Sequence, residues 1–168
     1  MIFFETGDIS ARTLRQEDAK RFHALCTQPS VLQWMDDWDM TLPQTEGLVR
    51  HYIKGYAVND PQRHPFLMAI WHKPSEELIG ICGFGPKEEL NGQPKIAYFP
   101  DARHTQRGYM TQVVEKAIDH YFTHFNKPAL YALVDDRNLP SKKILLHHGF
   151  QKVESYASNL PTHYRRDR

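Results

Sequence analysis

The stretch IAYFPDARHTQRGYMTQVVEKAIDHYFTHF, residues 96–125, decides the fold of this chain. It holds a short strand-like run, then a polar turn that ends at Gly108, then a regular helical pattern. From residue 110 onwards the apolar side chains recur at three-and-four spacing, which places one apolar stripe along a helix. The stripe consists of Met110, Val113, Val114, Ala117, Ile118, Tyr121, Phe122 and Phe125. The sequence therefore predicts a strand, a turn and an amphipathic helix in that order.

This order also predicts an anion site where the helix begins. The first turn of a helix carries free backbone N–H groups and the positive end of the helix dipole. Gly108 has no side chain to hold a bulky anion away from the main chain, so a diphosphate could bind there. The alternative is that Gly108 is only a loop glycine that needs a positive φ.

Length and charge bound the rest of the interpretation. A chain of 168 residues with 40% hydrophobic content suits one domain with its own core. Its 21 Lys and Arg residues nearly balance 20 Asp and Glu residues, which gives no electrostatic case for nucleic acid or an anionic membrane as a partner. Neither a membrane span nor a signal peptide is evident, so we expect a cytoplasmic protein. Cys26 and Cys82 lack the spacing of a zinc site or a disulfide framework, and we expect both to be reduced.

Alternating and helical patterns predict the remaining elements. Strands are expected at residues 9–15, 66–72, 78–84, 95–99, 129–134 and 150–157, and helices at residues 16–26, 45–58, 110–125 and 138–148. The pair Asn91 and Gly92 is a tight-turn signal that joins two of three consecutive antiparallel strands. This order describes an α+β sheet with helices on both faces.

The element order resembles that of the GNAT superfamily of acyl-CoA-dependent N-acetyltransferases. Residues 96–111, IAYFPDARHTQRGYMT, look like the family's strand, loop and Gly-Tyr helix entry. Other segments are similar to the branch that acetylates ribosomal-protein N-termini: VLQWM (31–35) with TLPQTEG (41–47), LIGICGF (78–84) and NLPSKKILLHHGF (138–150). The resemblance implies a GNAT-like fold, with a mixed, mostly antiparallel central sheet. It also implies a single acyl-CoA N-acyltransferase domain over residues 1–168.

The resemblance further implies acetyl-CoA as the co-substrate, without a metal, and a set of residues that bind it. These residues are Tyr98, Phe99, Gln106, Arg107, Gly108, Tyr109, Met110, Thr111 and Asn138. Thr105 stands where members of the family usually have Arg or Gln, and Met110 stands where they usually have Gly or Ala. Because such a loop binds phosphate mainly through backbone N–H groups, these changes need not abolish binding.

The residue implied to assist the leaving thiol is Ser141. Many members of the family use a tyrosine on the last helix, but this chain has Leu145 at that position. Ser141 matches a serine of the ribosomal-protein branch and could hydrogen-bond the coenzyme sulfur; the alternative is that its hydroxyl satisfies backbone groups at the helix start. Asn138 is implied to contact the pantetheine chain, with capping of the same helix as its alternative role.

Acyl transfer from a thioester to an amine requires a neutral amine, a polarised carbonyl and a protonated thiol. A backbone N–H near Tyr98 and Phe99 could polarise the carbonyl. A lysine amine with a pKa of about 10.4 is only about 0.04% neutral at pH 7, whereas an α-amine with a pKa of about 7.7 is about one-sixth neutral. The sequence offers no clear general base, which favours an α-amine. A solvated surface best explains the carboxylates that could attract a cationic amine, Glu88, Glu89, Asp36, Asp37 and Asp39.

The sequence thus predicts an N-acetyltransferase that moves the acetyl group of acetyl-CoA directly to a primary amine, on a peptide or protein N-terminus or on a small molecule. The alternatives are a catalytically silent CoA-binding regulatory module and a fold that binds no acyl-CoA. His120 and His124 share a helix face without an evident third ligand, so we expect a solvated face rather than a metal site. Trp34 and Trp38 could line an acceptor pocket or fill the core beneath their loop. The oligomeric state stays open, with a homodimer as one option.

Overall fold

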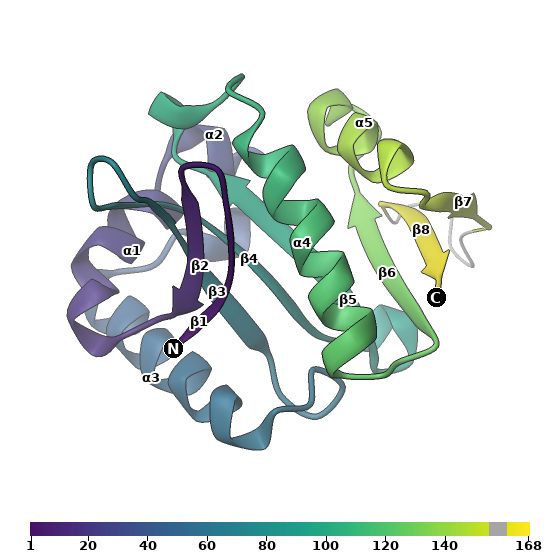
Figure 1. Cartoon of the computed structure of the whole chain (residues 1–168), viewed down its shortest axis with the longest axis horizontal. Helices are drawn as coiled ribbons and strands as arrows, with labels where there is room; N and C mark the ends of the chain where they lie inside the picture. The colour runs from purple at the N-terminus through teal and green to yellow at the C-terminus, as the bar shows by residue number, and fades with distance from the viewer. Residues whose placement is uncertain (155–160) are drawn as a thin grey trace.

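The computed structural model describes residues 1–154 and 161–168, and it is built around one eight-stranded sheet. The strands lie in the order β1-β2-β3-β4-β5-β6-β8-β7. Helices α4 and α5 cover one face of the sheet, and helices α1, α2 and α3 cover the other (Figure 1). The predicted α+β class, with a mostly antiparallel sheet and helices on both faces, is confirmed.

The bounds of the elements follow the predicted order closely. The strands are β1 (Ile2–Thr6), β2 (Ile9–Thr13), β3 (Phe66–His72), β4 (Glu77–Lys87), β5 (Gln93–Pro100), β6 (Ala129–Val134), β7 (Gln151–Val153) and β8 (Thr162–Asp167). The α-helices are α1 (Ala19–Cys26), α2 (Pro29–Leu32), α3 (Leu42–Val58), α4 (Tyr109–His124) and α5 (Leu139–His147). Within residues 1–154 and 161–168, no helix is both long enough and apolar enough to span a membrane.

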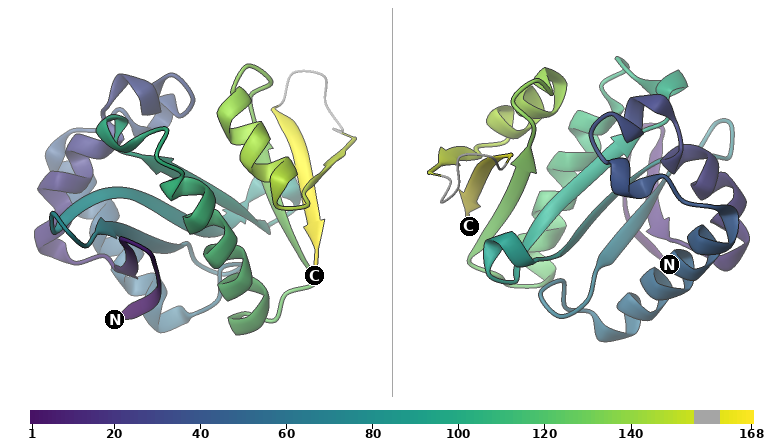
Figure 2. Two further views of the ribbon diagram at one scale, coloured as in Figure 1. Left: turned by 45° about the horizontal axis from the view of Figure 1, so that its top comes forward. Right: turned by 180° about the vertical axis from the view of Figure 1, so that it is seen from behind.

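The sheet has one weak seam, between β5 and β6. Strands β1 to β5 form an antiparallel meander. The whole of β5 pairs with β4, from Pro100 opposite Gly80 to Gln93 opposite Lys87. By contrast, β5 and β6 run parallel and share a single register pair, Lys95 with Tyr131. Beyond that pair the two strands diverge, as both views in Figure 2 show. The divergence leaves an opening in the middle of the sheet.

Two hydrophobic clusters fill the space on either side of the sheet. The larger cluster lies beneath α4 and contains the buried stripe of that helix, including Val113 and Ile118. The smaller cluster lies beneath α1 and α3 around Phe22 and Leu25. Strand β5 contributes to both clusters, because alternate side chains of a strand point to opposite faces: Ile96 joins the larger cluster and Phe99 the smaller one. The stripe predicted from the helical spacing is confirmed as a core face.

Helix α5 begins and ends where its sequence predicts. The Asn138 side chain accepts a hydrogen bond from the Ser141 backbone N–H at 3.2 Å, which caps the first turn. At the other end, Gly149 adopts φ 81° and its N–H bonds the carbonyl of Leu146, while the Phe150 N–H bonds the carbonyl of Leu145. This pair of bonds is a Schellman motif, which a residue with positive φ makes favourable. The cap fixes the direction in which α5 approaches the sheet.

Three elements were missed by the sequence prediction, and one strand was placed wrongly. Strand β1 lies at the sheet edge, and its consecutive residues Phe3 and Phe4 are both half-buried, so it lacks a clear alternation. Helix α2 is a single turn inside a loop. The C-terminal residues 162–167, for which the sequence predicts no element, form strand β8, which pairs with β6. The strand predicted at residues 150–157 is limited to β7, and residues 155–157 lie outside the described part of the chain.

The prediction of a solvated face for His120 is wrong. Its ring packs against Phe3 and Phe66 with centroid separations of 5.6 and 6.1 Å, and it stacks on His124 at 4.8 Å. Burial, reinforced by the neighbouring His124, lowers the pKa of His120 to about 4. No group of three or more His, Cys, Asp or Glu side chains in the described residues is arranged to hold a metal. His120 is therefore part of the aromatic packing between β1, β3 and α4.

The depressed pKa of His120 predicts a loss of stability in mild acid. The unfolded chain takes up a proton at His120 near its ordinary pKa of about 6.5, whereas the folded protein takes it up only near 4. The stabilising contribution is therefore present above pH 6.5 and is lost as the pH falls from 6.5 towards 4. The substitution His120→Leu should reduce this loss, measured as the change in urea midpoint between pH 7 and pH 5. An unchanged loss in the variant would contradict the assignment.

Candidate active site

A cavity of about 1020 Å³ lies where β5 and β6 diverge. Its walls come from α2 and the residues after it, the end of β5, the turn that enters α4, and α5 with the residue before it. Because α2 lies on one face of the sheet and α4 and α5 lie on the other, the cavity is bordered by both helical layers. All the predicted site residues except Arg107 line it: Tyr98, Phe99, Gln106, Gly108, Tyr109, Met110, Thr111, Asn138 and Ser141.

The turn into α4 has the backbone geometry that binds an anion. Gln106 and Gly108 adopt positive φ angles of 60° and 74°, and Gly108 is the residue that precedes the helix. Alternating conformations of this kind direct successive N–H groups to the same side, and the first turn of α4 adds N–H groups without helical partners. A Cβ atom placed on Gly108 would meet nothing within 4 Å. The space beside this backbone is therefore open to a ligand.

A buried ionic anchor holds this turn in place. Asp101 is almost completely buried, and its carboxylate accepts hydrogen bonds from Arg21 and from the Arg103 side chain and backbone. Its own N–H donates to the carbonyl of Ile79 on β4. Burial alone would raise the pKa of Asp101, but the bonds from Arg103 and Arg21 outweigh it and hold the pKa well below its usual range. The anchor fixes the point at which the chain leaves β5.

The two departures from the family pattern in this turn leave its backbone free. The Met110 side chain is only 8% exposed and packs into the core, where its Cε atom would lie 3.3 Å from a Cβ added to Gly80. The thioether therefore fills the space above a glycine of β4, and the Met110 N–H stays in the first helical turn. Thr105 is exposed and its hydroxyl donates to the carbonyl of Ala102 at 3.0 Å. Neither side chain occupies the open space at Gly108.

Tyr98 and Ser141 meet across the opening between β5 and α5. The Tyr98 hydroxyl lies 3.0 Å from Ser141 Oγ and 3.3 Å from the Ser141 carbonyl oxygen. Burial raises the pKa of Tyr98, so the phenol keeps its proton at neutral pH. The Ser141 hydroxyl is thus bound to a phenol rather than to the backbone of its helix. Leu145 is completely buried in the core and offers no hydroxyl to the cavity.

The titratable side chains on the cavity wall are one lysine and two histidines, and burial lowers the pKa of His104, so Lys143 supplies the positive charge. His104, Lys143 and His147 line the cavity, and no described Asp or Glu residue does. Glu88 and Glu89 lie at the far end of the β4–β5 hairpin. Asp36, Asp37 and Asp39 follow Met35, which lines the cavity, but they are exposed and do not line it themselves. The described wall therefore suits phosphate groups and contains no carboxylate base.

Trp34 and Trp38, for which the sequence allows either a pocket or a core role, have different roles in the fold. Trp34 lines the cavity, and the Arg137 guanidinium lies 5.9 Å from its ring centroid. Trp38 instead packs against Phe22 and Phe99, with its ring at 88° to that of Phe99. Trp34 is therefore a cavity residue and Trp38 a core residue. Their different roles follow from tertiary contacts that no local pattern records.

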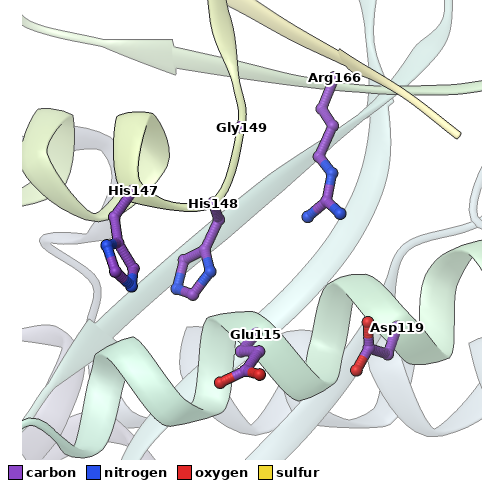
Figure 3. A pocket seen from close by; sticks show the side chains of 6 residues that line it. All are labelled: Glu115, Asp119, His147, His148, Gly149 and Arg166. Atoms are coloured by element: carbon purple, nitrogen blue, oxygen red, sulfur yellow. The ribbon is translucent and has the colours of Figure 1, made fainter.

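A second cavity of about 420 Å³ lies between α4, the end of α5 and β8. Figure 3 shows Glu115 and Asp119 on α4 opposite His147, His148 and Arg166. The His148 ring nitrogen Nε2 lies 3.0 Å from the Thr111 carbonyl and ties the end of α5 to α4. This cavity mixes both signs of charge, and of its lining residues only His147 also lines the larger cavity, so we assign its contacts to the packing of the two helices.

Comparison with known proteins gives a consistent family. Residues 9–151 match the acetyltransferase (GNAT) domain family. The uncharacterized N-acetyltransferase p20 of Bacillus licheniformis is 29% identical over 152 residues, which cover 88% of this chain and 81% of that protein. The ribosomal-protein-serine acetyltransferase of Escherichia coli (strain K12) is 25% identical over 131 residues, which cover 77% of this chain and 70% of that protein.

A solved structure shows the same fold with a ligand. The RimL ribosomal L7/L12 α-N-protein acetyltransferase, in complex with coenzyme A, has a TM-score of 0.81 to this chain and 16% sequence identity. The match covers 99% of this chain and 98% of that one. At this identity the likeness shows that the two chains share a fold.

The open space at Gly108 predicts a charge-sensitive ligand site. The substitution Gly108→Asp places a carboxylate beside the N–H groups of the turn, where it competes with phosphate and repels it. We expect the affinity for CoA, measured by isothermal titration calorimetry, to fall at least about tenfold, which corresponds to about 1.4 kcal/mol.

Gly92 provides the matched control for this substitution. It has a similar φ of 77°, an added Cβ would also meet nothing within 4 Å, and it lies in the β4–β5 turn far from the cavity. Gly92→Asp therefore imposes a similar backbone strain and the same charge without touching the ligand site. Equal losses of CoA affinity in the two variants would contradict the assignment.

Proposed function

Because the chain belongs to the GNAT acetyltransferase family, we propose that it acetylates the α-amine at the N-terminus of a peptide or protein. It is an acetyl-CoA-dependent acyltransferase, and acetyl-CoA is its co-substrate. The observation that carries the proposed acceptor is the described cavity wall, which is basic and holds no carboxylate. The acceptor must therefore be an amine that is reactive without a strong base.

The residues around the cavity fit acetyl-CoA. The backbone of residues 106–111 supports the diphosphate, and Lys143 adds positive charge to the same cavity. The diverging ends of β5 and β6 leave room for the pantetheine chain. Asn138 uses its carbonyl oxygen to cap α5, which leaves its amide NH₂ group to donate to that chain. The thioester carries the acetyl group as an electrophile for the amine.

The fraction of the acceptor amine that is unprotonated decides which class of amine can react. At pH 7 an α-amine is about 400 times more often neutral than a lysine amine, from pKa values of about 7.7 and 10.4. A base in the cavity would compensate for this difference, but no carboxylate among the described residues is placed to do so. Polyamines also carry several positive charges, which the basic wall repels. The ribosomal-protein-serine acetyltransferase of Escherichia coli, a relative, is named for a protein substrate.

Direct transfer of the acetyl group from the thioester to the amine accounts for every bond and proton without a covalent enzyme intermediate. The neutral amine nitrogen attacks the thioester carbon, so an N–C bond forms, and collapse of the intermediate breaks the C–S bond and leaves the electron pair on sulfur. The nitrogen loses one proton and the sulfur gains one, which water can carry between them. Cys26 and Cys82 are buried away from the cavity, and burial raises the pKa of both thiols, so neither serves as a nucleophile. In this proposal the hydroxyl of Ser141, which lines the cavity, donates a hydrogen bond to the sulfur.

One observation favours a second candidate function, a catalytically silent CoA-binding module. Leu145 is buried in the core at the position where many relatives carry a tyrosine donor. Turnover separates the two candidates, because a silent module binds CoA but releases no thiol with any amine. The cytoplasmic location, the single domain over residues 1–168 and the choice between monomer and homodimer remain predictions from the sequence.

The proposed acceptor predicts a specific pH dependence of selectivity. We expect kcat/KM at pH 7 for a peptide with a free N-terminus to exceed that for an N-blocked lysine peptide by about 400-fold from the neutral fraction alone. At pH 9 this factor should shrink to about 25-fold, because the lysine amine gains more neutral form than the α-amine does. Thiol release from acetyl-CoA measures both rates, with spermidine as a polycationic comparison. A preference for spermidine or for the lysine side chain at pH 7 would contradict the proposal.

A further inference from the structure

We infer that Tyr98 is a positioning residue whose phenol directs the Ser141 hydroxyl proton towards the thioester sulfur. The inference rests on the proposed function for the role of Ser141, and it gives the Tyr98 side chain a role beyond its predicted place in the coenzyme site. Tyr98 comes from β5 and Ser141 from α5, and they are 43 residues apart in the chain. Their contact forms only because the fold brings the end of β5 to the start of α5.

The position of Tyr98 in the sheet explains why its side chain reaches α5. Three residues before it, Lys95 makes the single register pair that joins β5 to β6. Past that pair the two strands separate, and the Tyr98 ring packs against the core cluster beneath α4 and lines the cavity. The Tyr98 hydroxyl therefore connects β5 to α5 at the point where β5 and β6 are no longer paired. A bond across this opening fixes the start of α5 relative to β5.

The number of protons on the two hydroxyl groups determines whether Ser141 can donate a hydrogen bond into the cavity. Each hydroxyl carries one proton, and a backbone carbonyl can only accept. In one arrangement the phenol donates to Ser141 Oγ at 3.0 Å, and the single Ser141 proton is free to point into the cavity. In the other arrangement the phenol donates to the Ser141 carbonyl at 3.3 Å, and Ser141 donates back to the phenol. Only the first arrangement offers a donor to sulfur, so growing negative charge on sulfur selects it.

The environment keeps the phenol in the donor role. Burial raises the pKa of Tyr98, so the phenolate is not populated at neutral pH and Tyr98 does not act as a base. No proton leaves Tyr98 or Ser141 in this scheme. As the C–S bond breaks and the electron pair moves to sulfur, the two hydroxyls form a chain of hydrogen bonds that ends on the sulfur, and the sulfur later takes up the proton lost by the amine.

The test uses the thiol of bound CoA, which needs no acceptor. Ultraviolet absorbance of the thiolate gives the thiol pKa of CoA in complex with the wild-type protein and with Tyr98→Phe, Ser141→Ala and the double variant. A donor at the sulfur stabilises the thiolate, so we expect the wild-type complex to have a thiol pKa about one unit lower than each variant. The double variant should match Ser141→Ala, because Tyr98 acts through Ser141. A thiol pKa that Tyr98→Phe leaves unchanged would overturn the inference.

Tyr121→Phe is the matched control. Tyr121 is buried, its hydroxyl donates to the Ala129 carbonyl at 3.0 Å, and it does not line the cavity. It loses one hydroxyl and one hydrogen bond, as Tyr98→Phe does, and should leave the thiol pKa unchanged.

Turnover gives a second readout of the same inference. Tyr98→Phe should lower kcat about tenfold with little change in KM for acetyl-CoA. The same substitution should have little further effect once Ser141→Ala has removed the hydroxyl that Tyr98 directs. Equal kcat losses from Tyr98→Phe with and without Ser141→Ala would also overturn the inference. Absence of turnover in the wild type, with the thiol pKa pattern intact, would reject the proposed function instead.

Discussion

The divergence of β5 and β6 is the constraint on which the rest of the structure depends. A parallel pair held by one register contact leaves backbone groups on both strand edges without a ladder, and buried groups of this kind need partners. A ligand that enters between the strands can supply them. The cavity of about 1020 Å³ lies at this point, with one helical layer on each side.

Two helix N-termini meet at this opening and set its electrostatics. Helix α4 begins just after Gly108, and helix α5 begins just after Asn138, so the positive ends of both dipoles border the cavity. The described charged side chains on the wall have the same sign. A nucleotide thioester brings the complementary negative charge at one end and an uncharged acyl group at the other. The described part of the cavity wall therefore attracts phosphate groups, and it has no negatively charged side chain that would attract a cationic acceptor.

Local patterns predicted the parts of the site that depend on backbone, and they failed where distant residues meet. The helical stripe from Met110 and the glycine before it predicted α4 and the turn correctly, because both follow from short-range geometry. The contact between Tyr98 and Ser141 joins residues far apart in sequence and has no local signal. Strand β8 was missed because Arg165 and Arg166 resemble a solvated tail. In the fold, the Arg165 guanidinium lies over the Tyr131 ring and the Arg166 guanidinium over the Phe122 ring, so both cations contact aromatic faces.

The central claim is that the backbone at the start of α4 and the opening between β5 and β6 together hold the acyl donor. A crystal structure with CoA bound tests it most directly. The account predicts the diphosphate against the N–H groups of residues 106–111, the pantetheine chain between β5 and β6, and the sulfur next to the Ser141 hydroxyl. CoA bound elsewhere on the molecule, with the β5–β6 opening filled by protein side chains, would contradict it.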